Sequence, residues 1–235
     1  MAPKNNYIKV AKEHEFVCQF DKVLCIFGAG GHAISVANVA LASGYKDIVF
    51  VSADRSENEL LGFPVKNNKQ LMDHGQVRAV AIAIGDNYKR SIITKTVTDQ
   101  HKLCFFPTLI HPSAVISEGC RIGHGTVVMP NAVVGPCSKV GNFVIVNTAA
   151  SLDHNTETAD FVSIAPNATL GGDVTIGKYS AIGIGATISH SIQIKENVVV
   201  GGASFVNRDT DPNTLIYGVP ARPIRLRRLG EEYLG

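Results

Sequence analysis

The sequence predicts two joined parts, an α/β domain followed by a parallel β-helix. In the first part, short β-rich runs alternate with helical stretches, an order typical of a parallel sheet with crossover helices. In the second part, a six-residue pattern repeats without an insertion, which is the signature of a β-helix. We therefore divide the chain into an N-terminal extension at 1–21, an α/β domain at 22–106, and a β-helix with a C-terminal tail at 107–235.

The α/β part begins with the apolar run "KVLCIF", followed by a stretch with the pattern of an amphipathic helix. The run "VRAVAIAIG" is apolar without a break, which indicates a strand buried on both faces of the sheet. We expect a short strand or arm within the N-terminal extension. The expected strands of the domain are 22–27, 47–52, 77–85 and 102–106, and the expected helices are 31–44 and 86–101.

The repeat becomes visible when the chain is read in sixes from Ala114. The third place of each hexad is aliphatic in fifteen of sixteen cases from Ile116 to Val206, and Thr158 is the exception. One aliphatic residue in six is too sparse for the apolar face of a helix. It suits short strands that each send one branched side chain inward. Three hexads make one coil, so residues 18 apart stack about 4.8 Å from each other.

Composition and charge exclude several classes of function. The chain has 235 residues, a formal net charge of +2 and 18% charged residues, so neither nucleic acid nor a membrane is an expected partner. No apolar run approaches the roughly 20 residues that span a bilayer, and the first residues contain no signal-peptide core. The five cysteines have no metal-binding spacing. We expect reduced thiols, a cytoplasmic protein and no bound metal.

Six motifs carry a resemblance to a known family: "FGAGGHA", "AIGDNYKR", "LIHPSAVIS", "VNTAASLDHN", "ATLGGDVTIG" and "YGVPARPIR". The chain resembles bacterial sugar-nucleotide acetyltransferases, which join a Rossmann-like domain to a left-handed β-helix. The family includes N-acetyltransferases of UDP-4-amino sugars and is related to sialic acid O-acetyltransferases. The resemblance implies acetyl-CoA as co-substrate, no metal, and a homotrimer with active sites between neighbouring β-helices.

His154, in "SLDHN", is the candidate general base for acetyl transfer. Imidazole suits this task because its ordinary pKa lies near neutrality, and the segment matches the catalytic segment of the family. A solvent-exposed turn histidine is the alternative interpretation. In relatives an acidic residue commonly follows this histidine and orients its ring, but here Asn155 stands in that place. Asp153 or another carboxylate is then needed if the ring is to have a charged partner.

Gly172 follows His154 by 18 residues, so we expect it one coil away at the same corner. Its backbone N–H is the candidate contact for the thioester carbonyl, although a simple turn glycine would explain it too. In the family, coil edges and the C-terminal segment line the groove that holds acetyl-CoA. Arg222 is a candidate for the phosphates, or an exposed residue that caps the solenoid. The predicted cofactor contacts are Ser163, Gly172, Ala181, Gly201, Gly202 and Arg222.

The glycine-rich turn of "FGAGGHA" has the form that binds dinucleotides, but the α/β domain is long enough for only one mononucleotide-binding half. Free N–H groups at a glycine turn and a helix N-terminus favour any phosphate. We therefore expect the turn to hold the diphosphate of a nucleotide sugar. Asn87 and Arg90, in "GDNYKR", are expected at the same edge of the sheet. The simpler explanation of this polar segment is that Asp86 caps the helix that follows. The predicted substrate contacts are Gly28, Gly30, Gly31, His32, Asp54, Asn87 and Arg90.

The sequence thus favours an acetyl-CoA-dependent N-acetyltransferase that acts on a nucleotide-linked amino sugar, with direct attack of the amine and His154 as base. The resemblance favours UDP as the nucleotide. Three alternatives stay open: an O-acetyltransferase of sialic acid or another sugar, a sugar-nucleotide-binding module without catalysis, and an NAD oxidoreductase. N-acetylation of a nucleotide-linked sugar requires a nucleotide at the glycine turn, whereas O-acetylation of sialic acid does not. Occupancy of that turn therefore distinguishes these two functions.

Overall fold

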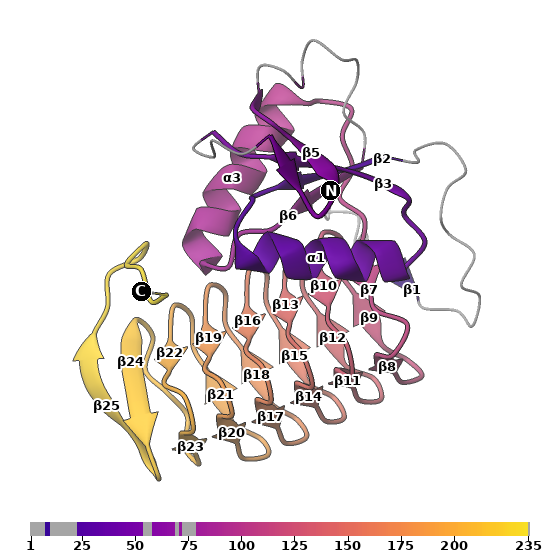
Figure 1. The fold of residues 1–235 in the computed structure, drawn as a ribbon. Coiled ribbons are helices and arrows are strands. Elements are labelled where there is room, and N and C mark those ends of the chain that lie inside the picture. Colours follow the sequence, from indigo (N-terminus) through magenta and orange to yellow (C-terminus); the bar gives the residue numbers. More distant parts are fainter. Residues whose placement is uncertain (1–7, 10–22, 54–57, 69–70, 72–78, 235) are drawn as a thin grey trace, which may run out of the picture.

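The computed structural model describes residues 8–9, 23–53, 58–68, 71 and 79–234 of the chain. An α/β domain lies over one long side of a β-helix, and the coils of the β-helix advance in a row beneath it (Figure 1). The predicted fold class is therefore confirmed: an α/β region followed by a left-handed parallel β-helix.

The α/β domain contains one sheet of five strands in the order β4-β5-β3-β2-β6. Its pairs are parallel except for β4, which runs antiparallel to β5. All four residues of β6 are buried, as the apolar run predicted. The elements are β2 (Val23–Phe27), α1 (Gly31–Ala42), β3 (Asp47–Val51), β4 (Glu59–Leu60), β5 (Phe63–Lys66), β6 (Ala79–Ile82) and α3 (Asn87–Gln100).

One expectation for this domain needs correction, and two of its strands were not expected. The strand expected at 102–106 is wrong, because only one bridge forms there, between Ala79 and Phe105. The chain leaves the sheet at once, and the Phe106 carbonyl already accepts a hydrogen bond from Gly125 of the β-helix. The sequence also gave no warning of β4 and β5, since β5 is only four residues long and contains Pro64.

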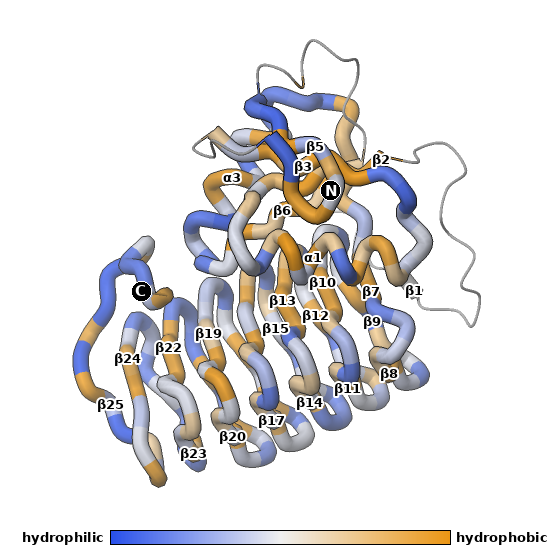
Figure 2. Tube along the Cα trace, in the orientation of Figure 1, coloured by the Kyte–Doolittle hydropathy of each residue, from blue (hydrophilic) through white to orange (hydrophobic). Residues whose placement is uncertain are grey.

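The β-helix follows the hexad register read from the sequence. Each short strand ends on the third place of a hexad, and these side chains fill the interior as one continuous cluster. Hydrophobic strand residues recur along the coils between more polar turns (Figure 2). The sixteen strands are β8 (Val115–Ile116), β9 (Arg121–Ile122), β10 (Val127–Val128), β11 (Val133–Val134), β12 (Lys139–Val140), β13 (Ile145–Val146), β14 (Ser151–Leu152), β15 (Glu157–Thr158), β16 (Ser163–Ile164), β17 (Thr169–Leu170), β18 (Thr175–Ile176), β19 (Ala181–Ile182), β20 (Thr187–Ile188), β21 (Gln193–Ile194), β22 (Val199–Val200) and β23 (Phe205–Val206).

Strands 18 residues apart pair in parallel, which confirms three hexads to a coil. Thr158, the one polar third-place residue, is buried, and its hydroxyl accepts the Gly141 N–H at 3.2 Å. This bond satisfies the hydroxyl inside an otherwise aliphatic core.

Four further strands join the ends of the solenoid. Part of the N-terminal extension forms β1 (Ile8–Lys9), which pairs antiparallel with β9. The strand β7 (Leu109–Ile110) pairs with β10 and begins the face beneath the α/β domain. At the other end β24 (Thr214–Gly218) and β25 (Ala221–Leu226) form an antiparallel pair.

The two domains share buried contacts. Leu109, Val127 and Met129 of the β-helix belong to the apolar cluster that surrounds α1. Phe143 of the β-helix belongs to a second cluster, together with Val97 of α3. Because apolar surface is buried on both sides of the sheet, the α/β domain has a fixed position over the coils.

Candidate active site

His154 lies in the turn between β14 and β15, at one corner of the β-helix. Its side chain is 50% exposed, so the ring is accessible to a substrate. The backbone N–H of His154 donates to Asp153 Oδ1 at 2.7 Å, which shapes the start of the turn. The following residue, Asn155, has a φ of 55°, a left-handed conformation that asparagine tolerates better than most residues.

Gly172 lies directly under the ring of His154, one coil further along. A Cβ atom on Gly172 would overlap the Cε1 and Nε2 atoms of the imidazole. The absence of a side chain at this position is therefore what lets the Nε2 edge of the ring lie against the backbone of the next coil. The stacking expected from the 18-residue spacing is present, and Nε2 and the Gly172 backbone lie together.

Two polar side chains lie on the Nδ1 side of the same ring. The Asn155 amide nitrogen is 3.2 Å from His154 Nδ1, and it donates to Asp173 Oδ1 at 3.0 Å. The second carboxylate oxygen, Oδ2, is 3.9 Å from Nδ1. Asp173 follows Asn155 by 18 residues and also has a left-handed backbone, with a φ of 60°.

Sequence reasoning did not single out Asp173, although a signal for it was present. The arithmetic that places Gly172 beside His154 also places Asp173 beside Asn155. Asp153, which the sequence suggested as a partner, instead accepts the backbone N–H of His154 through Oδ1.

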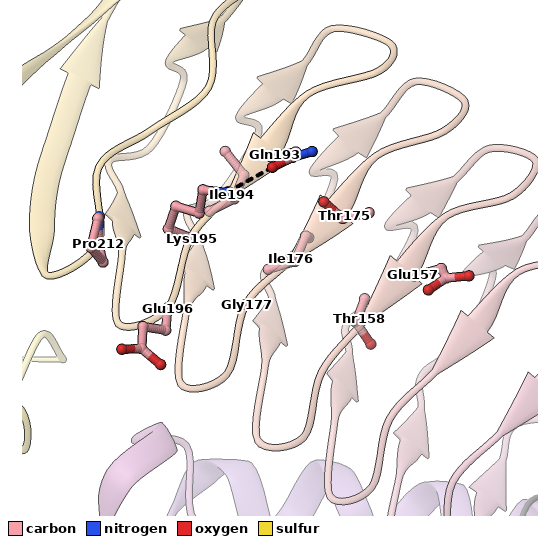
Figure 3. A pocket seen from close by; sticks show the side chains of 10 residues that line it. All are labelled: Glu157, Thr158, Thr175, Ile176, Gly177, Gln193, Ile194, Lys195, Glu196 and Pro212. Carbon is pink, nitrogen blue, oxygen red and sulfur yellow. Dashed lines mark hydrogen bonds between the residues drawn. The ribbon is translucent and has the colours of Figure 1, made fainter.

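A groove of about 480 Å³ runs along another face of the β-helix (Figure 3). Strands β15, β18 and β21 supply most of its lining, including Glu157, Thr175 and Gln193, and Pro212 closes one end. His154, Gly172 and the predicted cofactor contacts are outside this lining. The chemistry predicted from the sequence therefore belongs to the open corner rather than to the groove.

The glycine turn that precedes α1 has two different parts. Gly28 has a φ of 125°, its N–H donates to Val51 at 2.9 Å, and a Cβ atom there would come 2.7 Å from the Ala83 carbonyl oxygen. Its N–H thus donates within the chain, and a contact of Gly28 with a phosphate stays a prediction. Gly30 and Gly31 have open space around the Cα atom.

The N-terminus of α1 is built in a way that suits an anion. Gly30 is the N-cap residue and provides no side-chain hydrogen bond, and the first turn contains no acidic residue. The partial positive charge of the helix end is therefore left for an external group.

His32 lies in the first turn of α1, and its Nε2 atom is buried with no hydrogen-bond partner among the described residues. Burial, with a smaller contribution from the charge of Arg90, lowers the pKa of His32 to about 4. The ring is therefore neutral at physiological pH. A buried polar atom without a partner is costly, and a ligand that bonds to Nε2 would remove that cost.

Arg90 and Asn87, the expected nucleotide contacts, form hydrogen bonds with other parts of the chain. Arg90 is 1% exposed, and its guanidinium donates to Phe143 and Val162 of the β-helix as well as to Ile84 and Gly85 of the preceding loop. Burial lowers the pKa of Arg90 to about 10, so the group stays charged. Its N–H donors are thus used inside the chain, and the contact of Arg90 with a nucleotide stays a prediction.

Asn87 is buried as well, and its amide donates to the carbonyls of Tyr179 and Ser180 in the β-helix. Its side-chain oxygen accepts from Arg90 and from Ser163. The two residues therefore join the domains. The simpler explanation for Asp86 is confirmed, because its carboxylate caps α3 by accepting the Lys89 N–H at 2.9 Å.

The remaining predicted contacts are spread along the coils. The hydroxyl of Ser163 donates to Asn87 Oδ1 at 2.6 Å, so it takes part in the joint between the domains. Ala181 is buried, whereas Gly202 and Arg222 are exposed. Gly201 is half-buried, and a Cβ atom there would meet Tyr217 at 2.7 Å.

Asp54 lies outside the described residues. Within the described part of the chain, no group of three His, Cys, Asp or Glu side chains is placed to hold a metal ion. No helix in that part is long and apolar enough to cross a membrane.

Known proteins resemble the chain in sequence and in structure. Residues 23–97 match the family described as the PglD N-terminal domain. The acetyltransferase domain of PglB from Neisseria gonorrhoeae is 36% identical, with a TM-score of 0.81, over 87% of this chain and all of that one. That domain has also been solved in complex with acetyl coenzyme A. No curated protein matches the chain.

PerB from Caulobacter crescentus, solved with CoA and GDP-perosamine, is 30% identical with a TM-score of 0.78. The comparison covers 86% of this chain and 97% of that one. WeeI from Acinetobacter baumannii has the same fold at 23% identity, with a TM-score of 0.80 over 86% of this chain and 99% of that one.

The α/β domain that leads into a left-handed β-helix, together with the likeness to PglB, places the chain among acyltransferases. The chain belongs to the family of bacterial sugar-nucleotide N-acetyltransferases, as the likeness to PglB over nearly its whole length shows.

Proposed function

We propose that this protein transfers the acetyl group of acetyl-CoA to the amine of a nucleotide-linked amino sugar. The observation that carries the proposal is the His154 corner, where a half-exposed imidazole presents its Nε2 edge beside the backbone of Gly172. The relatives support the choice of substrates, because PglB binds acetyl coenzyme A and PerB binds CoA with GDP-perosamine.

The proposed reaction needs no covalent intermediate on the enzyme. The amine attacks the thioester carbonyl, the C–N bond forms, and the C–S bond breaks as CoA leaves. His154 Nε2 takes the proton that the amine loses, and this proton ends on the departing thiolate. The Gly172 N–H is the proposed donor to the carbonyl oxygen as negative charge develops on it.

The α/β domain would hold the nucleotide part of the acceptor. The uncapped N-terminus of α1 and the open space at Gly30 and Gly31 suit a diphosphate. His32 Nε2, buried and without a partner, is the proposed side-chain contact to the phosphates or the sugar. Because the ring of His32 is neutral, it can donate or accept one hydrogen bond there without adding a charge.

We further propose that the working form is a homotrimer. In one chain the His154 corner is an open surface, and the groove of Figure 3 does not include it. A second β-helix beside this corner would supply the missing wall for acetyl-CoA. Gly202 and Arg222, both exposed, are proposed contacts for acetyl-CoA in that arrangement.

The test is a thiol-release assay with acetyl-CoA and a panel of acceptors. The panel holds UDP-, GDP- and dTDP-linked 4-amino sugars and free sialic acid, and His154→Ala is assayed beside the unchanged protein. We expect release with a nucleotide-linked amine, UDP being the proposed nucleotide, and loss of that release in His154→Ala. Turnover with sialic acid alone would replace the proposal by O-acetylation, and tight nucleotide-sugar binding without any turnover would indicate a binding module.

A further inference from the structure

The residue that follows His154 is Asn155, so no carboxylate stands at the position directly after the histidine. The structure supplies a carboxylate from another direction. Asp173, in the next coil, is held through Oδ1 by the amide of Asn155, at 3.0 Å. Its other oxygen, Oδ2, faces His154 Nδ1 at 3.9 Å.

We propose that Asp173 is the positioning residue of His154, and that its carboxylate stabilises the imidazolium formed when Nε2 takes up the proton of the acceptor. This inference rests on the proposed function for the identity of the reaction. The contact between the carboxylate and the ring is independent of the acceptor, and it can be tested separately.

The division of work between the two carboxylate oxygens supports this role. The bond from Asn155 fixes Oδ1 and leaves Oδ2 on the side of the ring. To act as a base through Nε2, the neutral ring must carry its proton on Nδ1, so in that tautomer the Asn155 amide nitrogen, 3.2 Å away, does not donate to Nδ1. Nδ1 is then a donor both before and after Nε2 takes up the proton, and a closure of about 1 Å would bring Oδ2 of Asp173 to hydrogen-bond distance as its acceptor.

The backbone holds this arrangement. Both Asn155 and Asp173 occupy left-handed positions, with φ values of 55° and 60°. Strands β14 and β17 pair in register on one side of the corner, and β15 and β18 pair on the other. The distance between the coils is therefore set by backbone hydrogen bonds.

Asp153 is the other carboxylate near His154, and it does not have this geometry. Its Oδ1 accepts the backbone N–H of His154 at 2.7 Å, so it stabilises the turn. A role for Asp173 and a role for Asp153 are therefore distinguishable by substitution.

The test compares Asp173→Asn with the unchanged protein. Asparagine keeps the shape of the side chain and tolerates the left-handed backbone, so the fold is expected to persist. We expect kcat for acetyl transfer to fall about 10- to 100-fold, with KM for acetyl-CoA changed less than about 2-fold. The acidic limb of the kcat/KM profile should move to lower pH, because the carboxylate no longer favours the protonated ring.

The matched control is Asp160→Asn. Asp160 accepts the side-chain amide of Asn142 at 3.1 Å and its backbone N–H at 2.8 Å, so it forms an Asn–Asp pair at the same 18-residue spacing on another corner, away from His154. This variant should keep kcat and the pH profile. The double variant Asn155→Asp/Asp173→Asn moves the carboxylate next to His154 and should recover most of the lost kcat.

A second readout separates this inference from the proposed function. The ring signal of His154 is followed by proton NMR against pH without substrates, and its midpoint should lie lower in Asp173→Asn than in the unchanged protein. An unchanged midpoint together with an unchanged kcat would overturn the inference. A shifted midpoint in a protein that acetylates none of the acceptors would support the contact and contradict the proposed function.

Discussion

Two corners of the β-helix use related backbone turns for different ends. At one corner, His154 is exposed and its Asn–Asp pair, Asn155 and Asp173, faces the ring. At the other corner, the pair Asn142 and Asp160 stands beside residues that the α/β domain covers. The repeat of the β-helix determines which side chains stack on each other. The α/β domain determines which corner is covered and which stays exposed to a substrate.

The covered corner is a joint made of aromatic rings and one buried charge. Phe143, Phe161 and Tyr179 stack in successive coils, with centroid distances of 5.1 and 5.8 Å. The Arg90 Nε donates to the Phe143 carbonyl at 2.9 Å. We therefore expect substitutions at the His154 corner to lower kcat and to leave the free energy of unfolding nearly unchanged. Substitutions at the covered corner should lower the free energy of unfolding.

The largest effect is expected for His154→Ala. Removal of the general base should lower kcat by about 10²- to 10⁴-fold, as is typical for a group that accepts a proton in the transition state. Unfolding by urea should give a free energy within about 0.5 kcal/mol of the unchanged protein, because the side chain is half exposed. A variant that unfolds easily, or that retains kcat, would break the distinction between the corners.

At the covered corner, we expect Arg90→Met to lower the free energy of unfolding by about 3 kcal/mol. The substitution leaves the carbonyls of Ile84, Gly85 and Phe143 without their buried donor. In a chain of this size that loss corresponds to a Tm lower by roughly 6–12 °C. Calorimetry measures this shift, and a Tm within a degree of the unchanged protein would show that the joint contributes little.

Two glycine substitutions, one beside His154 and one away from it, separate an effect on kcat from an effect on stability. Gly172→Ala places a methyl group against the His154 ring, so the ring must move and kcat should fall about 10-fold or more, with little change in Tm. In Gly177→Ala the Cβ would lie 2.5 Å from the backbone nitrogen of Glu196, so that variant should lose about 1–3 kcal/mol of stability instead. Equal stability losses in the two variants would contradict this account of Gly172.

A smaller effect concerns the dependence of stability on pH. The pKa of His32 is lowered to about 4 by burial and by the Arg90 charge, so the unfolded chain binds a proton between pH 6.5 and 4 that the folded chain does not. Proton uptake by the unfolded chain therefore lowers the free energy of unfolding as the pH falls from 6.5 towards 4, and above pH 6.5 this loss is absent. Between these pH values, the unchanged protein should lose about 2 kcal/mol more than His32→Gln. Parallel stability curves for the two proteins would remove His32 as the cause.

The sequence predicted the β-helix to the residue because its rule is local. One inward aliphatic residue in every hexad but that of Thr158, from Ile116 to Val206, determines the register, and the 18-residue stacking of His154 on Gly172 follows from it. The joint between the domains was not predictable in this way. Arg90 sits next to a glycine-containing loop that suggests a ligand, and only the placement of the domain over Phe143 shows that its donors are used.

The role of Asp173 could be predicted from the sequence only in part. Its position followed from the same spacing that found Gly172, but its chemistry depends on which way two side chains turn across a coil boundary. The distances of 3.0 Å to Asn155 and 3.9 Å to His154 provide that information. The strand expected at 102–106 is wrong for a different reason, since β propensity could not reveal that the chain forms only one bridge to the sheet there, at Phe105.

The most direct test of the central claim is a crystal structure of His154→Asn with CoA and the nucleotide amino sugar that the assay identifies. We predict the sugar amine within about 4 Å of the substituted side chain, with the diphosphate at the N-terminus of α1 and next to His32. A diphosphate bound elsewhere, or an amine directed away from the corner where residue 154 meets Gly172, would contradict the account.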